Sequence, residues 1–121
     1  MSYELALVAI LTALCPRSLP VVAPWGTKMP YVIWQRVGGR AMRNLDKRPT
    51  GNLRNGRVSI TVWDETPMKA TALIRQIEDA LTASDAIQCT PLDEPLDMFD
   101  DGGSDAVIYG MQQSFSIWAR R

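Results

Sequence analysis

The strongest constraint on the fold is a stretch in which a strand pattern runs directly into a helix pattern. Between residues 57 and 63, apolar side chains alternate with small polar ones: Val58, Ile60 and Val62 alternate with Ser59 and Thr61. This alternation predicts a strand with one buried face. Thr66 and Pro67 then suit the N-cap and the first position of a helix. An apolar stripe at helical spacing predicts that this amphipathic helix covers residues 66–83 and buries Leu73, Ile74, Ile77 and Leu81.

Weaker patterns predict one more helix and three more strands. Leucine and isoleucine recur at helical spacing in residues 3–14, which end before Pro16, so a helix is predicted there. Strands are predicted over residues 31–37, 87–90 and 106–119. The four prolines of residues 16–30 predict an extended connection. The acidic stretch from Asp93 to Asp105 is predicted to be a loop that ends in a turn.

The predicted order of elements is α-β-β-α-β-β. Consecutive strands without helical crossovers favour an antiparallel sheet. We therefore expect a single α+β domain over residues 1–121, with a mainly antiparallel four-stranded sheet and two helices packed on one face. Residues 38–56 separate the first two strands and hold four glycines and few large apolar residues. They are predicted to form a long mobile loop.

Composition argues against an enzyme. The chain contains no histidine, which excludes His-dependent triads and HExxH zinc sites. Its two cysteines, Cys15 and Cys89, form no CxxC pair and are predicted to be small apolar residues of a protein kept in a reducing cytoplasm. The apolar run near the start is about half as long as a membrane span requires. We expect a soluble protein with no catalytic residue, no cofactor and no metal site.

The neutral net charge conceals a separation of charge along the chain. Residues 36–57 carry seven basic side chains and one acid, whereas residues 78–105 carry nine acids and no base. Three interpretations stay open: two solvated loops, surfaces that pair between copies of the chain, and a loop that contacts nucleic-acid phosphates. The candidate interface residues are Arg36, Arg40, Arg43, Lys47, Arg48, Arg54, Asp93, Glu94, Asp97, Asp100 and Asp101.

The order of these elements resembles the tail-terminator, or tail-completion, proteins of long-tailed bacteriophages and prophages. The resemblance rests on four stretches that follow the short N-terminal helix: Val22 to Thr27, Met29 to Gln35, Val58 to Trp63 leading into the alanine-rich helix, and Phe115 to Trp118. It extends over nearly the whole chain. The arginine-rich loop 38–56 departs from it, so no role is carried over to that loop.

The resemblance implies a structural virion protein without catalysis. Proteins of this family form rings, typically hexameric, that cap the tail tube, end its polymerisation and prepare the tail for head joining. The implied partners are other copies of the chain, the tail tube protein and the head connector, with DNA passing through but no sequence-specific binding and no membrane. A monomer in dilute solution is compatible with this, and assembly would take place in the host cytoplasm. The alternative function is a small nucleic-acid-binding module that uses the arginine-rich loop 38–56.

Overall fold

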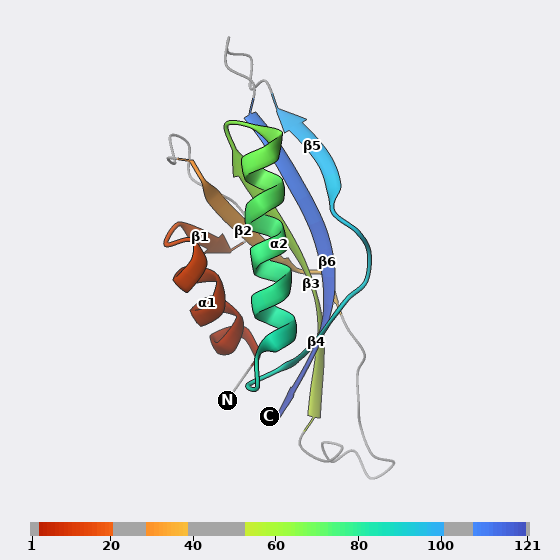
Figure 1. The fold of residues 1–121 in the computed structure, drawn as a ribbon. Helices are drawn as coiled ribbons and strands as arrows, with labels where there is room; N and C mark the ends of the chain where they lie inside the picture. Colours follow the sequence, from red (N-terminus) through yellow and green to blue (C-terminus); the bar gives the residue numbers. More distant parts are fainter. Residues whose placement is uncertain (1–2, 21–28, 39–52, 101–107, 121) are drawn as a thin grey trace.

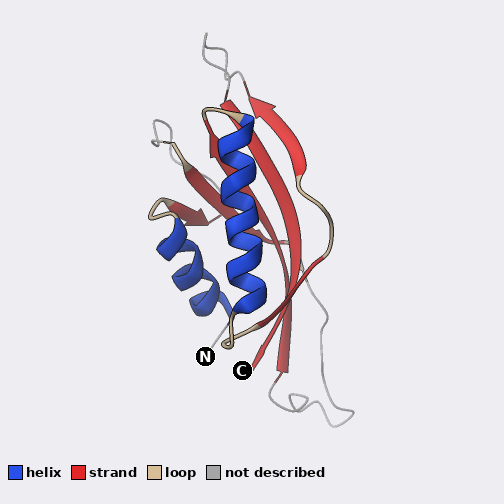
Figure 2. Ribbon diagram, in the orientation of Figure 1, coloured by secondary structure: helices blue, strands red, loops and turns tan. Residues whose placement is uncertain are grey.

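The computed structural model describes residues 3–20, 29–38, 53–100 and 108–120, and within them two helices and six strands. Both helices lie on one face of a single sheet (Figures 1 and 2). The elements in chain order are α1 (Tyr3–Leu14), β1 (Ser18–Pro20), β2 (Tyr31–Arg36), β3 (Leu53–Asp64), α2 (Pro67–Ala83), β4 (Gln88–Pro91), β5 (Leu96–Asp100) and β6 (Ile108–Arg120).

The sheet is built around the long antiparallel pair of β3 and β6. Their register runs from Leu53 opposite Arg120 to Asp64 opposite Tyr109. β2 pairs antiparallel with the other edge of β3, and the short β1 pairs parallel with β2. Two strands share the other edge of β6. β4 pairs near the C-terminal end of β6, and β5 pairs near the N-terminal end of β6.

In the gap between β4 and β5, a side chain continues the hydrogen bonding along the edge of β6. The Leu92 amide donates to the Ser114 carbonyl at 2.9 Å, and the Ser114 amide donates to Asp93 Oδ1, also at 2.9 Å. The exposed Asp93 side chain thus supplies the acceptor that a continuous neighbouring strand would have supplied from its backbone.

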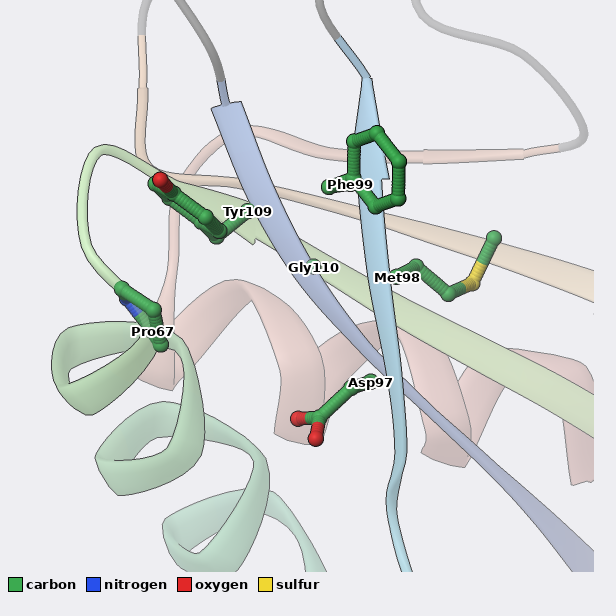
Figure 3. Close-up of a pocket in the computed structure, with 6 residues that line it drawn as sticks. All are labelled: Pro67, Asp97, Met98, Phe99, Tyr109 and Gly110. Atoms are coloured by element: carbon green, nitrogen blue, oxygen red, sulfur yellow. The ribbon is translucent and has the colours of Figure 1, made fainter.

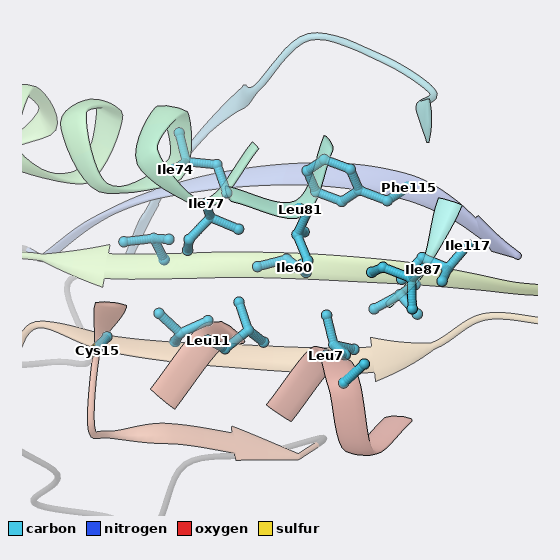
Figure 4. Packing of buried hydrophobic residues seen from close by; sticks show 14 of the residues in the cluster. Leu7, Leu11, Cys15, Ile60, Ile74, Ile77, Leu81, Ile87, Phe115 and Ile117 are labelled. Carbon is cyan, nitrogen blue, oxygen red and sulfur yellow. The ribbon is translucent and has the colours of Figure 1, made fainter. Parts of the chain in front are cut away.

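The core lies between the helices and the sheet (Figure 4). From α2, Ile74, Ile77 and Leu81 are fully buried, and from α1, Leu7 and Leu11. They pack in one cluster with sheet residues that include Val58, Ile60, Val62, Phe115 and Ile117. α2 begins as its sequence predicts, because Thr66 Oγ1 accepts a hydrogen bond from the Lys69 amide at 3.2 Å and Pro67 follows the cap.

Two strand glycines make room for aromatic rings. A Cβ at Gly56 of β3 would collide with the ring of Tyr3 at the start of α1, and a Cβ at Gly110 of β6 would lie 2.9 Å from Cε3 of Trp63. Real side-chain carbons do not approach this closely. The first glycine lets α1 dock against the sheet, and the second lets the Trp63 indole lie across β6.

The α+β class, both helices and the predominantly antiparallel sheet are confirmed. The four-stranded sheet is wrong, because the structure adds β1 within the predicted connection 16–30 and β5 within the predicted acidic loop. The loop prediction 38–56 is also too long, since β3 begins at Leu53. All three segments lack a strong strand pattern of their own and gain their conformation by pairing with a neighbouring strand. Residues 39–52 lie outside the described residues, so their predicted mobility stays a prediction.

Candidate functional site

The end of the molecule at which α2 begins and β5 ends carries a hollow of about 410 Å³ (Figure 3). Phe99 stands opposite Tyr109, and Met98 opposite Gly110, in the pairing of β5 with β6. Directly opposed residues of an antiparallel pair share one face of the sheet. The lining residues come from three elements: Pro67 from α2, Asp97, Met98 and Phe99 from β5, and Tyr109 and Gly110 from β6.

Large apolar side chains around this hollow are exposed to solvent. The exposed fraction is 74% for Phe99 on β5 and 83% for Met68, which follows Pro67 in the first turn of α2. Leu96 of β5 is also exposed, but it precedes Asp97 along the strand and therefore points to the opposite face of the sheet. Scattered apolar residues on a surface need no explanation, but two beside one hollow favour a docking surface. We call the six lining residues together with Met68 the β5 hollow.

The charge in the β5 hollow is negative. Asp97 is exposed and stands in register with Met111, on the face of the sheet that α2 covers. Its carboxylate lies on the same side of β5 as the first turns of α2 (Figure 3). None of the six lining residues is basic. The chemistry of the hollow therefore combines two aromatic rings with one accessible carboxylate.

The structure separates the predicted basic residues from the β5 hollow. Arg36 lies at the end of β2, where its Nη1 is 3.3 Å from Glu4 Oε1 of α1. Both side chains are accessible, so this ion pair contributes little to stability. The backbone of Arg54 pairs with Ala119 near the start of β3. The other four predicted bases, Arg40, Arg43, Lys47 and Arg48, lie outside the described residues.

The predicted acids have different environments. Asp97 lines the β5 hollow, whereas Asp93 accepts the Ser114 amide and so has a structural role in the sheet. Glu94 is exposed between β4 and β5, and Asp100 ends β5 with its backbone opposite Ile108. Asp101 lies outside the described residues. Among the acids whose side chains the structure describes, Asp97 is the one that lines the hollow.

A buried polar group anchors the connection that leads into β5. Gln113 of β6 is 1% exposed, and its Nε2 donates to Glu78 Oε1 of α2 at 2.7 Å and to the Asp93 carbonyl at 2.8 Å. Its Oε1 has no hydrogen-bond partner among the described residues. These hydrogen bonds join α2, β6 and the segment between β4 and β5, and so fix the connection that leads into β5.

Cys89 on β4 is unsuited to nucleophilic chemistry. Burial, and to a lesser degree the nearby charge of Glu78, raises the pKa of the Cys89 thiol to about 12. The thiolate is the reactive form of cysteine, and it is scarce at neutral pH when the pKa is high. The side chain therefore serves as a partly buried apolar group, packed against the core.

The described residues contain no group of three or more His, Cys, Asp or Glu side chains placed to hold a metal ion. None of the helices in the described ranges is long and apolar enough to cross a membrane. The sequence patterns indicated Asp97 but not Phe99, Met68 or Tyr109. The available signal was the apolar content of Leu96, Met98 and Phe99 inside a run of acids, which a solvated acidic loop does not require.

A comparison with known protein families gives a match over most of the chain. Residues 4–118 match the model of a family described as "Tail completion protein gp17". The matched range begins in α1 and ends in β6, so it includes every strand of the sheet. A search of curated proteins found no match.

Proposed function

The chain belongs to the tail completion protein gp17 family, and we propose that it is the subunit of a ring that caps the phage tail tube, ends tube polymerisation and prepares the tail for joining to the head. A tail completion protein is a structural component of the phage particle and not an enzyme. Its work is done by contact with other phage proteins. The surfaces that make such contacts are therefore its functional sites.

The observation that carries the ring proposal is the β5 hollow at one end of the subunit. Phe99 and Met68 remain largely exposed there although each is a large apolar side chain. Burying one such side chain contributes about 1.5–3 kcal/mol, so the two together can contribute substantially to an interface. A surface at one end that meets a different surface of the next copy forms a head-to-tail contact, and such contacts close into rings when the rotation permits.

The nucleic-acid-binding alternative has less support. It requires free arginines in residues 38–56, yet most of that segment lies outside the described residues. Arg36, at the segment's border, is paired with Glu4. The exposed aromatic Phe99 lies beside an acid, Asp97, which would repel phosphate.

Tube capping can be tested with purified components. The tail tube protein would be polymerised with and without the full chain, and tube lengths measured by electron microscopy. We expect shorter tubes with a gold-labelled copy of the chain at one end only. As a matched pair, Phe99→Ser should lose this effect and Leu5→Ser, an exposed apolar residue of α1, should keep it. Unchanged tube lengths, or label distributed along the tube wall, would contradict the proposed function.

A further inference from the structure

We propose that the β5 hollow receives the basic segment 39–52 of a second copy of this chain. The inference rests on the proposed ring, because it identifies the contact that would join neighbouring subunits. It also makes the separation of charge along the sequence part of the assembly mechanism.

The hollow selects for an occupant that is both cationic and apolar. Asp97 offers an accessible carboxylate, and Phe99 and Tyr109 offer aromatic rings beside it. A guanidinium group binds a carboxylate through paired hydrogen bonds and also stacks on an aromatic face. The exposed Met68, next to Pro67 of the lining, would bury an apolar side chain of the same occupant.

The segment 39–52 has this combination of side chains. It carries three arginines and one lysine against one acid, Asp46, and its large apolar residues are Met42 and Leu45. Arg40 and Arg43 flank Met42, so one short stretch can place a guanidinium on Asp97 and a thioether in the apolar part of the hollow. No other segment of the sequence outside the described residues is both strongly basic and apolar.

Geometry disfavours contact between the segment and the hollow of its own subunit. Gly38 is held to Arg57, whose amide donates to the Gly38 carbonyl at 2.8 Å, and Leu53 begins β3. Trp63 is the β3 residue in register with Gly110 of the hollow. At about 3.3 Å per strand residue, Trp63 is roughly 20 Å from Arg57 and roughly 33 Å from Leu53. The fifteen steps from Gly38 to Leu53 span about 50–54 Å when fully extended, so the segment would have to be stretched almost completely to reach its own hollow and return. A second copy imposes no such stretching, so the contact is proposed between two copies.

Crosslinking between two marked versions of the full chain tests this contact. One version carries Met68→Cys at the rim of the hollow and the other carries Leu45→Cys in the segment, with tags of different size. The two are mixed with a short bis-maleimide reagent. Background should be low because Cys15 is buried and burial raises the pKa of Cys89. We expect a hetero-crosslinked product that is at least tenfold more abundant than with Leu5→Cys in place of Met68→Cys.

Charge variants sharpen the test. Asp97→Lys should lower the crosslink yield at least tenfold, whereas Asp79→Lys, the same change on the exposed face of α2, should leave it unchanged. Arg40→Glu combined with Arg43→Glu should also lower the yield, and adding both to Asp97→Lys should restore it. Equal yields from Met68→Cys and Leu5→Cys, or no effect of Asp97→Lys, would overturn the inference.

Light scattering on the same mixtures separates the inference from the proposed function. Rings that form without a crosslink between Met68→Cys and Leu45→Cys would overturn the inference but would still support the proposed ring. A failure to assemble, with or without tail tubes, and no crosslink would overturn both. Crosslinking of Met68→Cys to the tail tube protein, without any product to Leu45→Cys, would assign the hollow to that partner and would also overturn the inference.

Discussion

Replacing Gly56 by alanine should destabilise the protein even though alanine is normally the better strand residue. Glycine in the middle of a strand costs roughly 0.5–1 kcal/mol relative to alanine, because its unfolded backbone has more freedom. At position 56, however, the added Cβ would lie 2.6 Å from Cε1 of Tyr3 and nearer still to Cζ and Oη. Carbon atoms in ordinary contact are about 3.5–4.0 Å apart. The ring must therefore move by about 1 Å or more.

The magnitude follows from how firmly Tyr3 is held. The side chain is 4% exposed and belongs to the core cluster, so its displacement disturbs the docking of α1 on β3. Overpacking of this kind costs about 1–3 kcal/mol. With the gain in backbone entropy subtracted, Gly56→Ala should lower the free energy of unfolding by about 0.5–2 kcal/mol.

A double-mutant cycle tests the cause. Tyr3→Leu removes the ring atoms that collide, so in that background Gly56→Ala should raise the free energy of unfolding by about 0.5–1 kcal/mol. The four proteins would be unfolded in urea at one concentration and followed by the fluorescence of their tryptophans. A reversal of sign between the two backgrounds supports the reasoning. The same effect in both, or a stabilising Gly56→Ala in the wild-type background, would refute it.

Three further measurements test the packing and the electrostatics. Ile77→Ala removes a fully buried side chain of α2 and should cost about 2–5 kcal/mol in urea unfolding, while Gln76→Ala on the exposed side should stay within about 0.5 kcal/mol. Thr66→Ala removes the acceptor of the Lys69 amide and should lower the unfolding free energy by about 0.5–2 kcal/mol, with Thr82→Ala as the exposed control. The raised pKa of Cys89 means that between pH 9 and about pH 12 the unfolded thiol loses its proton and the folded thiol keeps it. Stability should therefore fall with rising pH more steeply in the wild type than in Cys89→Ala, and parallel pH profiles of the two would contradict this assignment.

The elements that the sequence predicted correctly are those with local signals. Pro16 follows the end of α1, and Thr66 with Pro67 begins α2, so both helices were located to within one residue. The amphipathic stripe of α2 also identified Ile74, Ile77 and Leu81 as core, although Leu73, predicted to be buried with them, is only partly buried.

The elements that were missed depend on partners distant in the sequence. β1 is three residues long and ends in Pro20, so it becomes a strand only by pairing with β2. β5 contains two acids in five residues, which is typical of a solvated loop, yet its pairing with β6 holds it in the sheet. In both cases the pairing partner, rather than local propensity, decides the conformation.

The candidate site was only partly predicted, again because it depends on contacts between residues distant in the sequence. A count of charges could nominate Asp93 and Asp97 together, but it could not distinguish them. Asp93 is engaged by the amide of Ser114, a residue 21 positions away in the sequence, whereas Asp97 faces the hollow. The value of Phe99 as a docking residue also depends on the position of β5 at the outer edge of the sheet, which leaves its ring uncovered.

The place of β6 in the sheet has a consequence for how the chain folds during synthesis. This strand follows all the others along the chain, yet it lies between β3 on one side and β4 and β5 on the other. A ribosome makes the chain from its N-terminus, so β3 must wait for residues 108–120 with one edge unpaired. Pairings as distant in sequence as Leu53 with Arg120 also close slowly, because the intervening chain must first be brought together. The early helices can form while the sheet is still incomplete, but β4 and β5 can join β3 in one sheet only after β6 has been made.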